Sequence, residues 1–171
     1  MDKNIVLIGM PGAGKSTTGL LLAKTLNMPF VDTDLIIQQR EGRLLQEIID
    51  YDGIGPFLSI EEDAILQMSV RGYIIATGGS AVYREAAMRH LKKNGILLYL
   101  QLEYGEIEKR INNIKSRGIV MDKGRSLIDL YNERVPLYEK YADLTIRCSG
   151  KHIEEVVDEI QERMRGNKKF F

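Results

Sequence analysis

The sequence predicts an α/β fold, in which a parallel sheet carries helices on both faces. Five short apolar segments alternate with segments of helical periodicity, the pattern of a parallel sheet with helical crossovers. The first apolar segment leads into a glycine-rich loop that is followed by a helix. A length of 171 residues is typical of one domain with its own core. We therefore expect a single domain over residues 1–171.

The predicted strands are short and continuously apolar, as expected for strands that are buried on both faces. They cover residues 5–8, 29–31, 73–76, 96–100 and 144–148. Apolar residues at helical spacing predict helices between them, with a break at Gly42, over residues 16–26, 35–49, 57–68, 84–93, 103–114, 127–141 and 153–164. Gly53, Gly55 and Pro56 predict a loop over residues 51–56.

Residues 9–16 fit the phosphate-binding pattern Gly-x-x-x-x-Gly-Lys-Ser without a mismatch. Glycines let backbone N–H groups approach an anion, and the next helix directs its positive end to the same point. Lys15 adds a cation, and Ser16 is a Mg²⁺ ligand in this pattern. We expect nucleotide phosphates to contact Gly12, Ala13, Gly14, Lys15, Ser16 and Thr17. The alternative is an ordinary strand, turn and helix that carries glycines.

Polar or glycine-rich segments follow three of the predicted strands, at residues 9–16, 32–34 and 78–79. Since ligands of parallel sheets bind at the carboxyl ends of strands, we expect one shared site. Asp32 and Asp34 leave an extended strand on the same side. One carboxylate can hold Mg²⁺, and the other can accept the proton of a substrate hydroxyl. Alternatively, either of them caps the helix that begins near residue 35.

Glycines and arginines supply further candidates for this site. Gly78 and Gly79 either form a plain turn or offer N–H groups to a substrate. Arg110 ends a predicted helix, Arg117 lies in a polar loop with two glycines, and Arg134 precedes Val-Pro-Leu-Tyr. Arginine binds carboxylate or phosphate through two parallel hydrogen bonds. The alternative for each arginine is a solvated surface position.

The composition limits the partners that we expect. Lys plus Arg equals Asp plus Glu at 24 each, so no net charge attracts nucleic acid or an anionic membrane. No apolar run reaches the roughly 18 residues of a membrane-spanning helix, and no secretory signal pattern is present. The single cysteine, Cys148, and the lack of a Cys/His cluster argue against disulfides and zinc. We expect a cytoplasmic monomer that binds neither nucleic acid nor membranes.

Together these segments resemble the shikimate kinase family. Residues 8–19 are similar to its opening, residues 30–34 to its Asp-x-Asp segment, residues 76–79 to its glycine segment and residues 133–138 to its Arg-x-Pro-Leu-Tyr segment. The resemblance implies a three-layer α/β/α P-loop kinase fold with a five-stranded parallel sheet. It also implies a substrate-binding helical segment at about 33–62 and a mobile lid at about 112–125.

The resemblance further implies ATP-dependent phosphorylation of shikimate to shikimate 3-phosphate, a step of aromatic amino acid biosynthesis, with Mg²⁺. The catalytic residues that it implies are Lys15, Asp32, Asp34 and Arg117, with Asp34 as base. The implied metal ligands are Ser16 and Asp32. The implied substrate contacts are Asp34, Gly78, Gly79 and Arg134, which would bind the carboxylate. Arg110 would pack against adenine, and Arg117 would reach the phosphates from the lid.

The chain departs from the family pattern between the second and third strands. The family usually has Gly-Glu-x-x-Phe-Arg-x-x-Glu, whereas Ile54 and Leu58 stand at the first Glu and at the Arg here. That arginine pairs with the substrate carboxylate in the family, and losing such a bond typically costs ~2–5 kcal/mol. Arg43 and Lys123 are candidates to replace it.

Two further departures are a serine at the third glycine of the family's triplet, Ser80, and a lid that reads Arg-Gly-Ile-Val where the family has Arg-Pro-Leu-Leu. Two alternatives therefore stay open beside shikimate phosphorylation. The first is the same reaction on a different small alcohol or polyol. The second is a nucleotide-binding module with weak catalysis.

Overall fold

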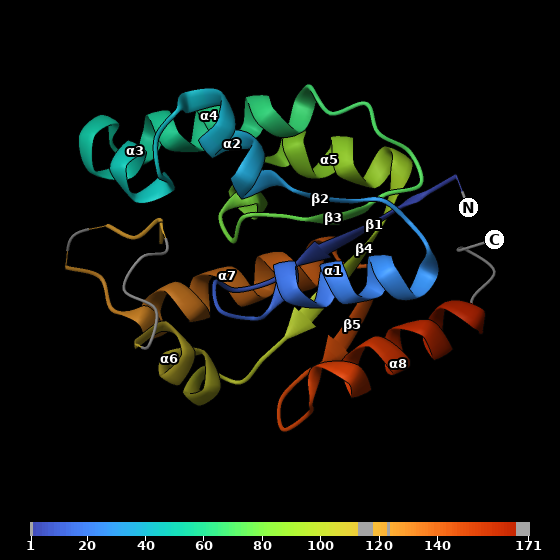
Figure 1. Ribbon diagram of the computed structural model, residues 1–171. Coiled ribbons are helices and arrows are strands. Elements are labelled where there is room, and N and C mark those ends of the chain that lie inside the picture. The colour runs from blue at the N-terminus through green and yellow to red at the C-terminus, as the bar shows by residue number, and fades with distance from the viewer. Residues whose placement is uncertain (1, 113–117, 123, 167–171) are drawn as a thin grey trace.

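The computed structural model describes residues 2–112, 118–122 and 124–166, which form a parallel sheet covered by helices (Figure 1). The strands are β1 (Asn4–Ile8), β2 (Phe30–Asp32), β3 (Ile74–Ala76), β4 (Gly95–Gln101) and β5 (Leu144–Arg147). They form one five-stranded sheet in the order β2-β3-β1-β4-β5, and every neighbouring pair is parallel. The predicted α/β fold with a five-stranded parallel sheet is confirmed.

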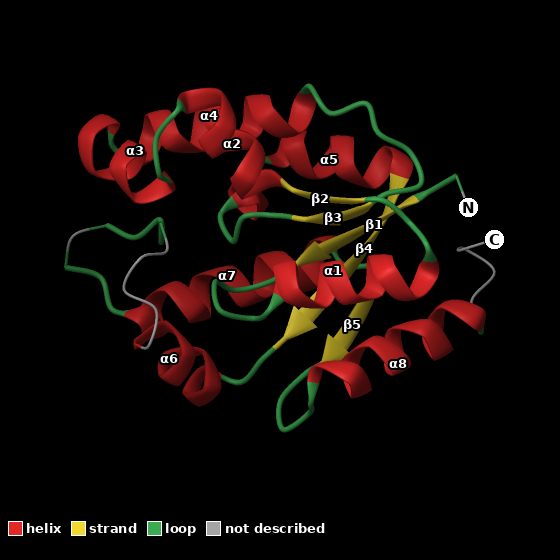
Figure 2. Ribbon diagram, viewed as in Figure 1, coloured by secondary structure: helices red, strands yellow, loops and turns green. Residues whose placement is uncertain are grey.

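Helices connect the strands and cover the sheet (Figure 2). They are α1 (Lys15–Leu26), α2 (Thr33–Glu41), α3 (Leu45–Asp52), α4 (Ile54–Leu66), the 3₁₀ helix η1 (Ala81–Tyr83), α5 (Glu85–Asn94), α6 (Tyr104–Asn112), α7 (Leu127–Tyr141) and α8 (Ile153–Arg165). Helices α1 and α8 pack against each other on one side of the sheet, and α5 lies on the other side. None of the described helices is long and apolar enough to cross a lipid bilayer.

The predicted loop over residues 51–56 is wrong, because α3 continues to Asp52 and α4 begins at Ile54. Gly53 adopts a φ of 93° between the two helices and lets the chain change direction. Pro56 lies in the first turn of α4, where the backbone N–H groups have no intrahelical acceptor, so its missing N–H costs no hydrogen bond. The first such bond of α4 is made by the N–H of Phe57, which donates to the Gly53 carbonyl at 3.2 Å.

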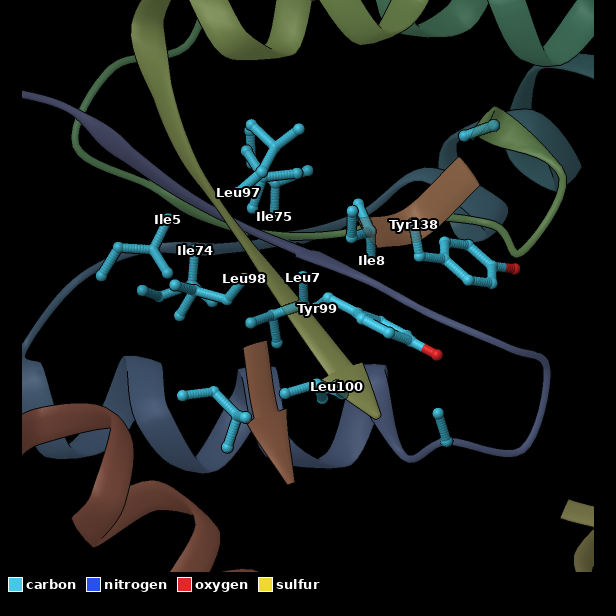
Figure 3. Packing of buried hydrophobic residues seen from close by; sticks show 14 of the residues in the cluster. Ile5, Leu7, Ile8, Ile74, Ile75, Leu97, Leu98, Tyr99, Leu100 and Tyr138 are labelled. Carbon is cyan, nitrogen blue, oxygen red and sulfur yellow. The ribbon is translucent and has the colours of Figure 1, made fainter. Parts of the chain in front are cut away.

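Two separate groups of buried apolar side chains stabilise the fold. The larger group fills the space around the sheet, and all five residues of β1 are buried (Figure 3). Tyr99 of β4 and Tyr138 of α7 stack in it with their ring centroids 5.2 Å apart. The smaller group lies in the helical segment α2–α4 and includes one residue from outside it, Val120; its members are Ile37, Leu45, Ile48, Ile49, Phe57, Ala64 and Val120.

Candidate active site

The glycine-rich loop connects β1 to α1 at the carboxyl edge of the sheet. Gly12 and Gly14 have φ angles of 82° and 88°, in a region that other L-residues rarely adopt, which explains the need for glycine at both positions. Lys15 is the first residue of α1, and its Nζ folds back to donate to the carbonyls of Gly9 at 2.7 Å and Met10 at 2.9 Å. These bonds fix the ammonium group over the loop.

The remaining predicted nucleotide contacts lie around the same loop. The side chain of Ala13 is buried in the core, so only its backbone is placed to contact a phosphate. Ser16 and Thr17 are exposed in the first turn of α1. The N–H groups of this first turn and the positive end of a 12-residue helix form an anion site. Arg110 of α6 lies against the loop and donates from Nη1 to the Gly12 carbonyl at 3.2 Å. Arg117, predicted to act from the lid, lies outside the described residues.

Ser16 and Asp32 form a polar pair beside the loop. The Ser16 hydroxyl donates to Oδ2 of Asp32 at 2.5 Å, and the other carboxylate oxygen accepts from the N–H of Asp34 at 3.0 Å. A hydroxyl and a carboxylate are hard oxygen ligands, and Mg²⁺ in nucleotide sites is held by one or two such groups together with phosphate oxygens. The pair therefore fits a magnesium ion that is bound with a nucleotide. Among the described residues, no group of three or more His, Cys, Asp or Glu side chains could hold a metal ion.

Asp32 and Asp34 both face the loop, although not for the predicted reason. Extended structure does not continue past Asp32, because α2 begins at Thr33. Asp32 is the N-cap of α2 and also accepts the hydrogen bond from Ser16, so its side chain caps the helix and faces the loop at the same time. Asp34 is not the cap. A cavity of about 210 Å³ brings the groups together, and its lining includes Lys15, Ser16, Asp32, Asp34, Gly79 and Gly118.

Gly78 leaves room for two carboxylates. A Cβ on Gly78 would lie 2.2 Å from Oε1 of Glu61 and 2.8 Å from Oδ1 of Asp34, so only glycine fits. The two oxygens are therefore at most 5.0 Å apart. Glu61 is 0% exposed, and its Oε1 has no hydrogen-bond partner among the described residues. Its other oxygen accepts from the Ser80 hydroxyl at 2.7 Å, a bond that the family's third glycine could not make.

Glu61 was not among the site residues predicted from the sequence. Its place on α4 is a signal that was available, since Phe57, Ala64 and Ile65 mark the buried face at the same helical spacing. A carboxylate on the apolar face of a helix is rare without a function or a partner.

Replacing Glu61 by glutamine is expected to change how stability depends on pH. Burial is the largest cause that raises the pKa of Glu61 to about 7; the Ser80 hydrogen bond opposes this effect and the charge of Asp34 adds to it. The folded state keeps the proton up to about pH 7, whereas the unfolded chain releases it near pH 4.5. The free energy of unfolding should therefore fall as the pH rises between these values, by about 1–3 kcal/mol, and Glu61→Gln should flatten this slope.

Urea unfolding at several pH values between 4.5 and 8 measures this effect, with the exposed Glu162→Gln of α8 as the control that keeps the wild-type slope. Equal slopes in the wild type and in Glu61→Gln would contradict the assigned protonation of Glu61.

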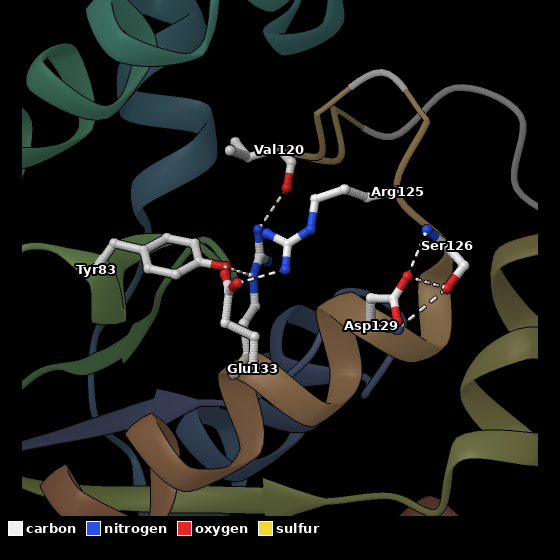
Figure 4. A network of polar contacts seen from close by, with 7 residues as sticks. Tyr83, Val120, Arg125, Ser126, Asp129 and Glu133 are labelled. Carbon is white, nitrogen blue, oxygen red and sulfur yellow. Dashed lines mark hydrogen bonds and ion pairs between the residues drawn. The ribbon is translucent and has the colours of Figure 1, made fainter.

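Arg134 is buried on α7. It belongs to a network of polar contacts, of which Tyr83, Val120, Arg125 and Glu133 are labelled in Figure 4. Its Nη2 donates to the carbonyl of Val120 at 2.6 Å, and its Nε donates to the Tyr83 hydroxyl at 3.1 Å. Tyr83 in turn hydrogen-bonds Glu133, which also accepts from Nη2 of Arg125 at 2.6 Å. Gly79 lies close by, since a Cβ on it would be 3.1 Å from Nη1 of Arg134. The solvated alternative for Arg134 is therefore wrong, because its side chain is 0% exposed.

The segment that departs from the family pattern lines a second cavity, of about 290 Å³. Ile54 and Leu58 of α4 form part of its wall, one helical turn apart. Arg43 does not reach this cavity, because it binds Asp52 through two hydrogen bonds of 2.6 and 3.1 Å at the surface. Lys123, the other candidate to replace the arginine, lies outside the described residues.

Comparison with known proteins gives a consistent result. A family model described as shikimate kinase matches residues 11–165. The chain is 37% identical to a shikimate kinase of Caldanaerobacter subterraneus subsp. tengcongensis, with 92% of this chain and 94% of that protein covered. It is 38% identical to a shikimate kinase of Thermodesulfovibrio yellowstonii, with 92% of each chain covered.

Solved structures agree with the sequence relatives. A shikimate kinase from Acinetobacter baumannii in complex with shikimate superposes with a TM-score of 0.91 at 29% identity, covering 98% of this chain and 96% of that one. A shikimate kinase from Aquifex aeolicus gives a TM-score of 0.80 at 32% identity, covering 96% of this chain and 97% of that one.

Proposed function

Because the chain belongs to the shikimate kinase family, we propose that it transfers the γ-phosphoryl group of ATP to a hydroxyl of shikimate, giving shikimate 3-phosphate and ADP. The observation that carries this proposal is the single cavity that contains Lys15, Ser16, Asp32 and Asp34. Phosphoryl transfer to an alcohol needs a phosphate cradle, charge neutralisation and a group that accepts the hydroxyl proton. The backbone N–H groups at the start of α1 supply the cradle, Lys15 and a Mg²⁺ ion at Ser16 and Asp32 would neutralise the charge, and Asp34 would accept the proton.

The phosphates of ATP bind along the loop between Gly9 and Ser16, where N–H groups and the Lys15 ammonium face them. Ser16 and Asp32 would hold Mg²⁺, which neutralises phosphate charge in such sites. Arg110 lies against the same loop, and we assign it to nucleotide binding. For Arg117 we propose a contact with the phosphates from the lid.

The acceptor binds on the Asp34 side of the cavity. Asp34 accepts the proton of the attacking hydroxyl while the hydroxyl oxygen bonds to the γ-phosphorus and the bond from phosphorus to the departing ADP oxygen breaks. Gly79 lines the same cavity, Gly78 lets Glu61 and Asp34 approach each other, and Arg134 binds the substrate carboxylate from behind Gly79. We also propose that the protein is a monomer and that it is located in the cytoplasm.

A coupled ADP-release assay with shikimate and a panel of polyols tests the proposal. We expect shikimate to be the fastest acceptor, and activity to require added Mg²⁺ and to be lost with excess chelator. Background turnover of shikimate together with fast turnover of another alcohol would overturn the assignment of the acceptor but not that of phosphoryl transfer.

A further inference from the structure

The 290 Å³ cavity that Leu58 lines has both apolar and charged residues in its lining. Its apolar lining residues are Ile54, Leu58, Val120, Met121 and Leu130. Arg84 and Arg125 bring two positive charges to it, and Asp122 and Glu133 bring two negative ones. An apolar wall with guanidinium groups in its lining suits a small organic anion with a carbon skeleton.

Arg134 contacts residues that line this cavity and a residue that lines the cavity of Asp34. Its Nη1 lies behind Gly79, which lines the Asp34 cavity. Its other two nitrogens are bound by Val120 and Tyr83, which line the cavity of Leu58. A hydroxy acid with its hydroxyl at Asp34 and its carboxylate at Arg134 therefore directs the carboxylate toward the second cavity.

Of the two arginines that line the second cavity, Arg84 makes the longer, weaker polar contacts. Arg125 donates to Glu133 at 2.6 Å. The Nε of Arg84 lies 3.9 Å from Oε2 of its ion-pair partner Glu62, and its Nη2 makes one long hydrogen bond, of 3.5 Å, to the Ser59 hydroxyl. Its Nε is buried and has no hydrogen-bond partner among the described residues. A buried N–H that makes no hydrogen bond is costly, which makes an incoming anion favourable at this point.

Arg84 also stands where the family pattern has lost its cation. Ser59 and Glu62, the two α4 residues that it contacts, follow Leu58 in the sequence by one and four residues, and Leu58 and Arg84 line the same cavity. The positive charge is absent from α4 at residue 58 and is present at Arg84, the N-cap of α5, in the lining of the same cavity.

We propose that Arg84 is a specificity-determining residue, whose guanidinium pairs with the carboxylate of the bound hydroxy acid beside Arg134. The proposal rests on the proposed function and deepens it, because it assigns the second cation of the acceptor site. Arg84 replaces the charge that Leu58 lacks, so recognition of the acid is retained.

Steady-state kinetics of Arg84→Ala with shikimate test this assignment. Removing one charge-assisted contact to a carboxylate should raise the KM for shikimate roughly 10- to 100-fold, and the KM for ATP should stay at its wild-type value. Arg84→Lys keeps the charge, and its KM for shikimate should lie between those of the wild type and of Arg84→Ala. The matched control is Arg89→Ala, an exposed arginine of the same helix, which should behave as the wild type.

Two further measurements separate recognition from a structural effect. Adding Leu58→Arg to Arg84→Ala restores a cation to the same cavity and should lower the KM for shikimate again. The methyl ester of shikimate, measured as a competitive inhibitor, lacks the charge; the wild type should prefer the acid over the ester, and Arg84→Ala should reduce that preference.

A KM for shikimate within twofold of wild type in Arg84→Ala would overturn the role of Arg84 alone. So would a parallel rise of the KM for ATP with a loss of thermal stability, which a purely structural role would cause. Background turnover of shikimate by the wild type would overturn this proposal and the proposed function together.

Discussion

Replacing Asp34 by asparagine is expected to lower kcat for shikimate phosphorylation at least ~100-fold, the scale of a lost general base. Asparagine has nearly the same shape and keeps the cavity, but it does not accept the hydroxyl proton at neutral pH. The KM for ATP should change little, because Lys15, Ser16 and the loop stay intact. Coupled ADP release at saturating shikimate measures the effect.

The Asp34→Asn defect should also persist at high Mg²⁺ concentration, since Asp34 is not one of the two proposed metal ligands. Asp50→Asn, an exposed aspartate of α3, serves as the matched control and should turn over as the wild type does. Normal turnover in Asp34→Asn would remove this side chain from catalysis.

Replacing Lys15 by alanine should lower kcat at least ~100-fold as well, because a fixed positive charge beside the transferred phosphoryl group stabilises the transition state. Nζ also bridges the carbonyls of Gly9 and Met10, so its loss affects the loop itself. Lys15→Met, which keeps most of the side-chain volume, controls for packing and should show the same kinetic loss.

Lys24→Ala, on the exposed side of the same helix, is the second control for Lys15 and should retain wild-type kinetics. Thermal unfolding of each variant reports whether the fold is intact. A kcat within tenfold of wild type in Lys15→Met would show that the ammonium is not needed for the chemistry.

The sheet could be predicted from the sequence because its strands are buried on both faces and are therefore apolar without interruption. The start of α4 could not, because Gly55 and Pro56 are breakers in a helix interior and are tolerated in a first turn. The short helix η1 could not be predicted either, because three residues are too few to show a helical periodicity.

Some residues of the candidate site could likewise be predicted from the sequence, and others could not. Lys15 and Ser16 are fixed by a contiguous motif, so their positions follow from local structure. Glu61 and Ser80 are 19 residues apart in sequence and meet only because α4 packs against the turn after β3. The contacts of Arg84 with α4 arise likewise from tertiary packing, which no local pattern encodes.

Val120 belongs to the small apolar cluster of α2–α4, and its carbonyl accepts from Arg134. Val120, which lies in the predicted lid, thereby packs with the helices that are predicted to bind the substrate. Moving Val120 away from this cluster would expose apolar surface, so we expect the free energy of displacing Val120 to be linked to that of loosening α3. Amide hydrogen exchange should report one cooperative unit, in which Val120→Ala speeds exchange in α3 while the strands of the sheet stay protected.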